Sequence, residues 1–120
     1  MPHERLQQFV AIDYTQQLVI LAIIFQGEKE SIVGVGQYAL IEKTHTAEVG
    51  LAVRDEHQNK GVGIALLSTL TYLARRQGLL GFYGEVLFEN RAMLHLFEKM
   101  GFDIKKRREE GVYELQMMFR

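Results

Sequence analysis

Apolar residues recur along this chain with two different periods. Runs rich in valine, isoleucine and leucine occupy residues 17–26, 32–41 and 47–54, and each run predicts a β-strand. Short polar turns separate the three runs, so we expect the strands to form an antiparallel meander. Residues 4–10 predict a short helix or the remnant of a helix. Because the sequence begins with this segment, we expect the 120 residues to be the C-terminal part of a longer chain.

A helical period follows the third run. Residues 62–77 predict a helix because their apolar positions fall on one stripe. That stripe consists of Leu66, Leu67, Leu70, Leu73 and Ala74. Residues 81–88 predict a further strand, and Asn90 is a suitable N-cap for a second helix that Gly101 ends. Residues 102–107 and 112–119 predict a closing hairpin.

The predicted order of elements is β-β-β-α-β-α-β-β. It describes an α/β (α+β) domain with a mixed sheet, in which an antiparallel meander precedes a crossover. Because a helix joins the third and fourth strands, these two strands should lie parallel. We expect one domain over residues 1–120.

Composition narrows the classes of function. The 120 residues are 48% hydrophobic and include one proline, which suits a single domain with a real core. The absence of cysteine excludes disulfides, thiolate nucleophiles and cysteine-ligated zinc, and the four histidines lack metal-ligand spacing, so we expect no metal. The net charge is −1, no apolar run is long enough to cross a bilayer, and the start does not read as a signal peptide. We therefore expect a cytoplasmic protein without nucleic-acid or membrane partners.

The stretch QNKGVG, residues 58–63, joins the third strand to the first long helix. The first backbone N–H groups of a helix have no intrahelical partner, and the helix dipole adds partial positive charge there. Because Gly61 and Gly63 let a ligand approach the backbone, the loop suits phosphate or pyrophosphate, and a plain strand-to-helix turn is the alternative. The spacing matches neither the Walker A loop nor the G-x-G-x-x-G dinucleotide pattern, since residue 66 is leucine.

In its wider context this stretch resembles the acyl-CoA-binding motif [RQ]-x-x-G-x-[GA] of the GNAT N-acyltransferases, matched by Gln58, Gly61 and Gly63. A second motif of that family, an asparagine leading a helix that ends in Gly-Phe, is matched by NRAMLHLFEKMGF, residues 90–102. The resemblance covers nearly all of residues 17–120 and is greatest to the acetyltransferase domain of Pat-type bacterial protein lysine acetyltransferases. It implies a GNAT-like fold whose usual first strand and first helices are missing or truncated here.

The resemblance also implies where acyl-CoA binds. The backbone N–H groups of residues 59–64 would hold its pyrophosphate, with Lys60 adding a charge, and the main chain of residues 51–53 would hold the pantetheine arm. The implied binding residues are Leu51, Ala52, Val53, Gln58, Asn59, Lys60, Gly61, Val62, Gly63, Ile64, Asn90 and Phe97. Phe97 departs from the family, because many members have a proton-donating tyrosine there. A backbone N–H near Val53 is the expected oxyanion donor.

Two glutamates are candidates for a general base, which must take a proton from an amine before it attacks a thioester. Strand alternation places Glu48 beside the small residues Gly50 and Ala52, on a face with room for a ligand. Glu48 is the first choice, and an exposed strand glutamate without a catalytic role is the alternative. Glu85 is the second candidate, because a carboxylate inside the strand FYGEVLF needs a partner or solvent.

The expected function is transfer of an acetyl or other short acyl group from acyl-CoA to a primary amine, by direct attack. The Pat-like resemblance favours a protein lysine as acceptor and a fused or partner CoA-handling domain. The alternative is a non-catalytic acyl-CoA-binding module of a larger CoA-handling enzyme. The basic run KKRR, residues 105–108, is interpreted as a solvated hairpin face, with a site for the CoA 3′-phosphate or an acidic partner as the other interpretation.

Overall fold

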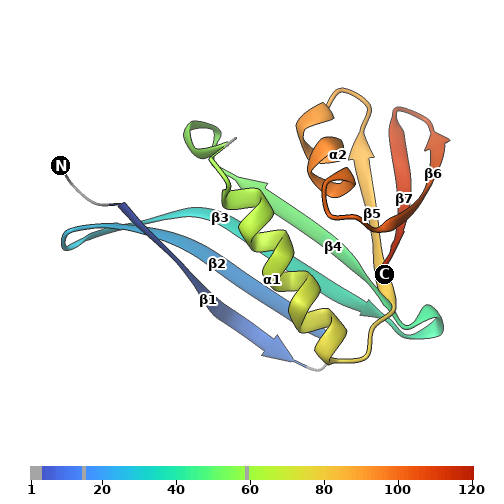
Figure 1. The fold of residues 1–120 in the computed structure, drawn as a ribbon, viewed down its shortest axis with the longest axis horizontal. Coiled ribbons are helices and arrows are strands. Elements are labelled where there is room, and N and C mark those ends of the chain that lie inside the picture. Colours follow the sequence, from blue (N-terminus) through green and yellow to red (C-terminus); the bar gives the residue numbers. More distant parts are fainter. Residues whose placement is uncertain (1–3, 15, 59) are drawn as a thin grey trace.

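The computed structural model describes residues 4–14, 16–58 and 60–120 and contains one mixed sheet with two α-helices (Figure 1). The order of strands across the sheet is β1-β2-β3-β4-β5-β7-β6. The strands are β1 Glu4–Tyr14, β2 Gln17–Gln26, β3 Lys29–Ile41, β4 Thr46–Val53, β5 Gly81–Leu87, β6 Asp103–Glu109 and β7 Val112–Met118. The helices are α1 Val62–Arg76 and α2 Arg91–Glu98, and short 3-10 turns span η1 Glu42–Thr44 and η2 Asp55–His57.

The predicted fold class is confirmed, with one more strand than expected at the start. Residues 4–10 belong to β1, so the prediction of a helix there is wrong. Glu, Arg, Leu and Gln favour helix locally. However, β1 pairs antiparallel with β2 from Glu4 to Tyr14, with one register shift between Val10 and Ile12. This ladder gives the backbone of β1 hydrogen-bond partners, which outweighs its local helix propensity. The order is therefore β-β-β-β-α-β-α-β-β.

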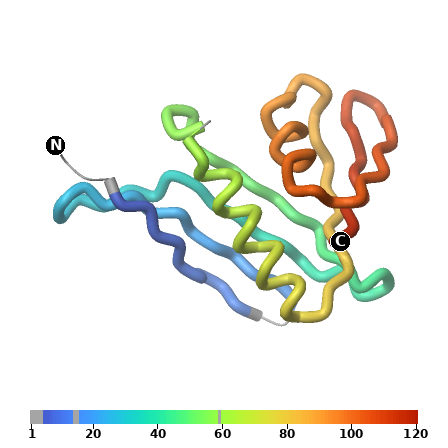
Figure 2. The backbone as a smooth tube through the Cα atoms, in the orientation of Figure 1, coloured from blue at the N-terminus to red at the C-terminus, as the bar shows by residue number. Residues whose placement is uncertain are grey.

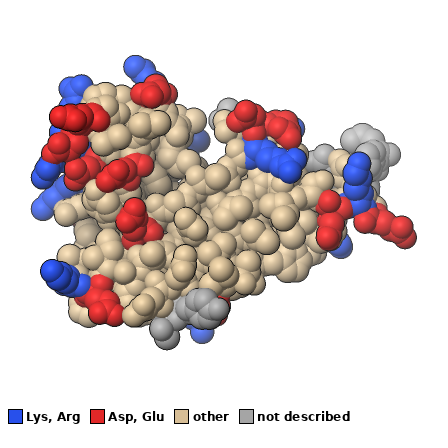
Figure 3. All heavy atoms as spheres, turned by 180° about the vertical axis from the view of Figure 1, so that it is seen from behind, with Lys and Arg blue, Asp and Glu red and all other residues tan. Residues whose placement is uncertain are grey.

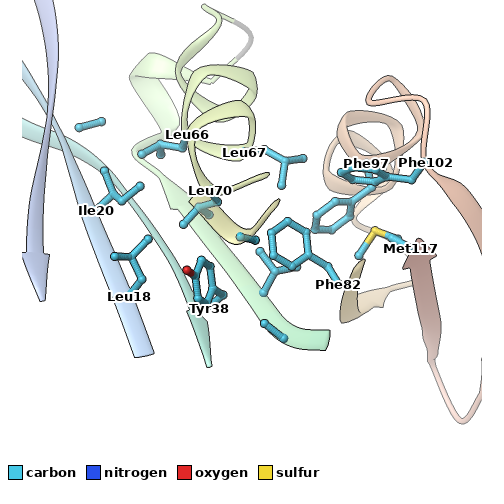
Figure 4. Close-up of a cluster of buried hydrophobic side chains, with 14 of the residues drawn as sticks. Leu18, Ile20, Tyr38, Leu66, Leu67, Leu70, Phe82, Phe97, Phe102 and Met117 are labelled. Atoms are coloured by element: carbon cyan, nitrogen blue, oxygen red, sulfur yellow. The ribbon is translucent and has the colours of Figure 1, made fainter. Parts of the chain in front are cut away.

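The main core lies between α1 and one face of the sheet (Figure 4). Leu66, Leu67 and Leu70 project from α1 onto that face and are fully buried. Tyr38 of β3 and Phe82 of β5 belong to the same core cluster, with ring centroids 6.1 Å apart. The stripe predicted from the sequence is thus the packing face of α1.

The sheet is joined at its middle by a short parallel contact, as predicted. Only residues 46–48 of β4 pair with β5, and the last pair is Glu48 with Tyr83. Both strands continue beyond this pair and separate, as the backbone trace shows (Figure 2). Gly81 begins β5 where a Cβ atom would collide with the main-chain oxygen of Met117 and lie 2.8 Å from Cα of Met118, so only glycine fits there.

The face of the sheet opposite α1 carries few charges over its middle, and charged side chains gather towards the ends (Figure 3). Strand β1 forms one edge of the sheet. Among its described side chains, Leu6, Phe9, Val10 and Ile12 are large, apolar and exposed. No helix in the described part of the chain is long and apolar enough to cross a membrane.

Candidate active site

The glycine loop makes the start of α1 a concentrated group of backbone donors. Gly61 is the N-cap and has a φ of 85°, a left-handed conformation that favours glycine. No side chain among the described residues caps the helix, and its first intrahelical bond runs from the Ala65 N–H to the Gly61 carbonyl at 3.0 Å. The N–H groups of residues 62–64 precede that bond and so lack intrahelical partners. This end of α1 is therefore suited to an anion.

Gln58 fastens the loop to the end of β4. Its Nε2 atom donates to the main-chain oxygen of Val53 and to Oδ1 of Asp55, both at 3.2 Å. The motif glutamine thus has a structural role in holding the loop over the strand end.

A cleft of about 500 Å³ opens between the start of α1 and the side of α2. Its lining residues are Val53, Gln58, Gly61, Gly63, Ile64, Asn90, Ala92, Met93, His95, Leu96 and Lys99. Gly63 sets the closeness of the two helices, because a Cβ atom there would lie 3.0 Å from Cδ2 of Leu96. The second glycine of the motif therefore makes room for α2, which the sequence did not indicate.

Six of the predicted binding residues line this cleft: Val53, Gln58, Gly61, Gly63, Ile64 and Asn90. Phe97 does not line it, because it lies on the apolar face of α2 and is buried at 3% exposure in the core. Val62 is also buried, so only its backbone can face a ligand. Lys60 is exposed and is not among the lining residues, and Asn59 lies outside the described residues.

The structure adds one wall of the cleft that the sequence analysis missed. Beyond Asn90, it is lined by four residues of α2 and the C-cap of that helix: Ala92, Met93, His95, Leu96 and Lys99. His95 is exposed, as expected for a residue off the apolar stripe, and it is one of the residues that line the cleft. The signal was present in the sequence, because steps of three and four residues from Ala92 through Leu96 to Lys99 define one face of a helix.

The main chain of β4 beyond Glu48 has one side without a strand partner. The Arg54 N–H donates to the Val33 oxygen of β3 at 2.8 Å, so by the two-residue period Ala52 also points to β3. Leu51 and Val53 then point into the opening between β4 and β5, and the contact from Gln58 to the Val53 oxygen agrees with this. The main chain of Leu51 and Val53 thus faces the opening, whereas that of Ala52 faces β3, and the holding of a ligand arm by these residues stays a prediction.

Glu48 lies at the apex of that opening. It forms the last paired position of β4 with β5 and is exposed, whereas Ala47 and Val49 on either side are buried toward α1. Its side chain therefore lies on the face of the sheet opposite α1. A ligand arm that enters from the cleft and follows the opening would approach Glu48 from the face of the sheet that α1 covers.

Glu85 lies two residues beyond Tyr83 on β5, and its side chain is on the same face of the sheet as that of Glu48. The Tyr83 hydroxyl donates to Oε1 of Glu85 at 3.1 Å, and Glu114 of β7 lies directly opposite Glu85 in the ladder. Burial, then the hydrogen bond and charge of Glu85, raise the pKa of Tyr83 to about 12. Tyr83 therefore stays protonated near neutral pH, and part of the acceptor capacity of Glu85 is already used.

The basic run 105–108 does not reach the cleft. Lys106 lies 5.0 Å from the ring centroid of Tyr113, Arg108 lies 5.0 Å from that of Phe88, and Arg107 pairs with Glu109. This agrees with the interpretation of the run as a hairpin face. Within the described residues, no group of three His, Cys, Asp or Glu side chains is placed to hold a metal ion.

Known proteins are similar to this chain in sequence. The model of the acetyltransferase (GNAT) family matches residues 2–102. Acetyltransferase PA5475 of Pseudomonas aeruginosa is 30% identical over 97 residues, which are 81% of this chain and 52% of that protein. The chain thus spans about half the length of this relative.

Solved structures of other proteins have a similar fold. The GNAT domain of Pat from Streptomyces lividans has a TM-score of 0.76 at 28% identity, over 90% of this chain and 64% of that one. The PaiA N-acetyltransferase of Thermoplasma acidophilum, solved in complex with coenzyme A, has a TM-score of 0.72 at 19% identity, over 87% of this chain and 62% of that one. The second likeness concerns the fold alone.

Proposed function

The chain belongs to the acetyltransferase (GNAT) family, and from this premise we propose that it transfers an acetyl or other short acyl group from acyl-CoA to a primary amine, with Glu48 as general base. The observation that carries the proposal is the opening between β4 and β5. Its mouth is the cleft beside the donors of α1, and its apex is the pair of Glu48 and Tyr83.

In this proposal the N–H groups at the start of α1 hold the pyrophosphate, and the free side of β4 holds the pantetheine arm. Leu51 is three residues beyond Glu48, roughly 10 Å along the strand, whereas Val53 is roughly 17 Å away. The thioester must lie close to the base, so the Leu51 N–H is the better oxyanion donor than one near Val53.

The chemistry then needs few groups. The amine arrives as an ammonium ion, with a reference pKa of about 10.4, and Glu48 takes one proton from it, directly or through a water. The nitrogen lone pair forms a bond to the thioester carbonyl carbon. The C–S bond breaks, and its electron pair leaves with the sulfur of CoA. The nitrogen loses its second proton as the amide forms, and the departing thiolate takes up this proton through water, so that CoA leaves as the thiol.

We assign Glu85 a supporting role at the acceptor side. It shares a face with Glu48, but its carboxylate already accepts the Tyr83 hydroxyl and lies opposite Glu114. A carboxylate in this position attracts a cationic acceptor. The exposed position of Glu48 and the likeness to the Pat domain favour a protein lysine, and a small amine is the alternative acceptor.

The test is CoA release from acetyl-CoA in the presence of lysine peptides and small amines. We expect Glu48→Gln to lower kcat about 10²- to 10⁴-fold while the Kd for CoA stays within about twofold. Glu85→Gln should mainly raise the KM for the acceptor. Glu30→Gln, on the distant β2–β3 hairpin, is the matched control and should behave as wild type. Wild-type kcat in the Glu48→Gln variant would exclude Glu48 as the base.

A second function has one observation in its favour. Phe97 cannot donate a proton and is buried away from the cleft, so the site lacks the acid that many family members have. A domain that binds acyl-CoA without turnover, as a module of a larger enzyme, would have such a site. Tight binding of acetyl-CoA with no acceptor-dependent CoA release would select this second function.

A further inference from the structure

Two basic side chains of the cleft have no part in the proposed reaction. His95 and Lys99 both line the cleft from α2, one helical turn apart on the same face. Neither makes an ion pair among the described residues, and both are exposed. They face the opposite wall, where the N–H groups at the start of α1 are concentrated.

The described lining of the cleft includes basic side chains but no acidic ones. Its other polar lining side chains are the neutral amides of Gln58 and Asn90, and no described lining residue is an aspartate or glutamate. A lysine ammonium has three donors, and an imidazole has at least one in either protonation state. The lining therefore suits a ligand with more than one anionic group, held from both walls.

We propose, on the basis of the acyl-CoA function above, that His95 and Lys99 bind the 3′-phosphate of acyl-CoA. Coenzyme A carries two separate anionic groups, a pyrophosphate and a phosphate on the ribose. The start of α1 provides one site for an anion, and it suits the pyrophosphate. Lys99 and His95 across the cleft then provide the second site. The run at residues 105–108, the sequence candidate for this phosphate, pairs with aromatic rings and carboxylates elsewhere.

A simpler explanation of the two residues is helix stability. His95 lies in the last turn of α2 and Lys99 is its C-cap, where positive charge interacts favourably with the helix dipole. That explanation predicts an effect on unfolding but no discrimination between ligands. A pair of ligands that differ only in the 3′-phosphate therefore separates the two explanations.

The experiment is calorimetric titration of the 120-residue chain with CoA and with 3′-dephospho-CoA at one fixed ionic strength. We expect wild type to bind CoA at least about tenfold more tightly, as one charge-assisted contact at an exposed site would give. Lys99→Gln and His95→Gln should each reduce this preference, and the double variant should bind both ligands equally. Affinity for 3′-dephospho-CoA should stay within about twofold in all variants.

Lys106→Gln is the matched control, because Lys106 is a cation on β6 outside the cleft, and it should keep the full preference. Equal affinity of wild type for both ligands overturns the proposal, as does an equal loss for both ligands in Lys99→Gln, which would assign Lys99 to the pyrophosphate. Absence of binding to either ligand would instead reject the acyl-CoA function itself. Unfolding of each variant without ligand checks that the helix is intact.

Discussion

At the scale of single residues, Tyr83 and Phe97 decide whether a side chain can protonate the leaving thiolate in the proposed reaction. Phe97 is a core residue and has no proton to donate. Tyr83 is at the apex of the opening, but its pKa of about 12 is roughly three units above that of a thiol, so proton transfer to a leaving thiolate is uphill. Tyr83 is therefore a hydrogen-bond donor to Glu85 rather than a general acid.

This assignment predicts the titration of Tyr83. Because its pKa is raised in the folded protein above the value of about 10 in the unfolded chain, the associated stability is present below pH 10 and is lost as the pH rises through 12. We expect the free energy of unfolding to fall more steeply over this range in wild type than in Tyr83→Phe. Ultraviolet titration of phenolate should show that Tyr83→Phe lacks the group with a midpoint near 12.

Removal of the partner provides the control for this prediction. Glu85→Gln should lower the midpoint of Tyr83 only part of the way to 10, since burial is the larger cause of its shift. A midpoint near 10 for Tyr83 itself in wild type would contradict both the burial of its hydroxyl and its contact with Glu85.

At the scale of elements, α2 contributes one face to the core and the opposite face to the cleft. One side of this helix packs Phe97 into the core, and the other lines the cleft with His95, Leu96 and Lys99. Asn90 belongs to both, because it lines the cleft and its Oδ1 accepts from the Met93 N–H at 3.2 Å. The motif asparagine is therefore a helix cap as well as a candidate ligand contact.

Substitutions at Asn90 should separate these two roles. We expect Asn90→Ala to lower the free energy of unfolding by about 1 kcal/mol, measured with urea, because the cap is lost. Asn90→Asp should keep the cap and the stability. It should nevertheless weaken CoA binding several-fold, because it places a carboxylate in a cleft whose described lining has none. Equal CoA affinity in Asn90→Asp and wild type would show that Asn90 does not approach the phosphates.

At the scale of the whole molecule, the sheet consists of two parts joined by three residue pairs. Strands β1–β4 with α1 form one part, β5–β7 with α2 form the other, and β4 pairs with β5 only over residues 46–48. The cleft draws its lining from both parts. A ligand in the cleft would therefore connect them beyond the short parallel contact.

Ligand binding should accordingly stabilise the entire fold. At a free acetyl-CoA concentration of 100 times Kd, we expect about 2.7 kcal/mol of added stability and a rise in Tm on the order of 10 °C. Hydrogen exchange should slow in α2 as well as in the loop before α1. Protection confined to the loop and α1 would mean that the ligand contacts one part of the molecule only.

The sequence by itself determined the elements whose signals are local. Strand β2 has the predicted bounds, α1 differs by one residue at its end, and Asn90 caps α2 as expected, because periodicity and capping depend on neighbouring residues. The sequence also predicted an anion site at the start of α1, and this stays a prediction. The left-handed φ of Gly61 shows that the loop needs a glycine at this position.

Only the tertiary structure decided the rest. Strand β1 exists because β2 offers it a ladder, although its own residues favour a helix. His95 and Lys99 become a wall of the cleft because Gly63 lets α2 approach α1. The opening that leads to Glu48 depends on the separation of β4 from β5 after three pairs. Each of these features is a contact between residues distant in sequence, and no local period encodes such a contact.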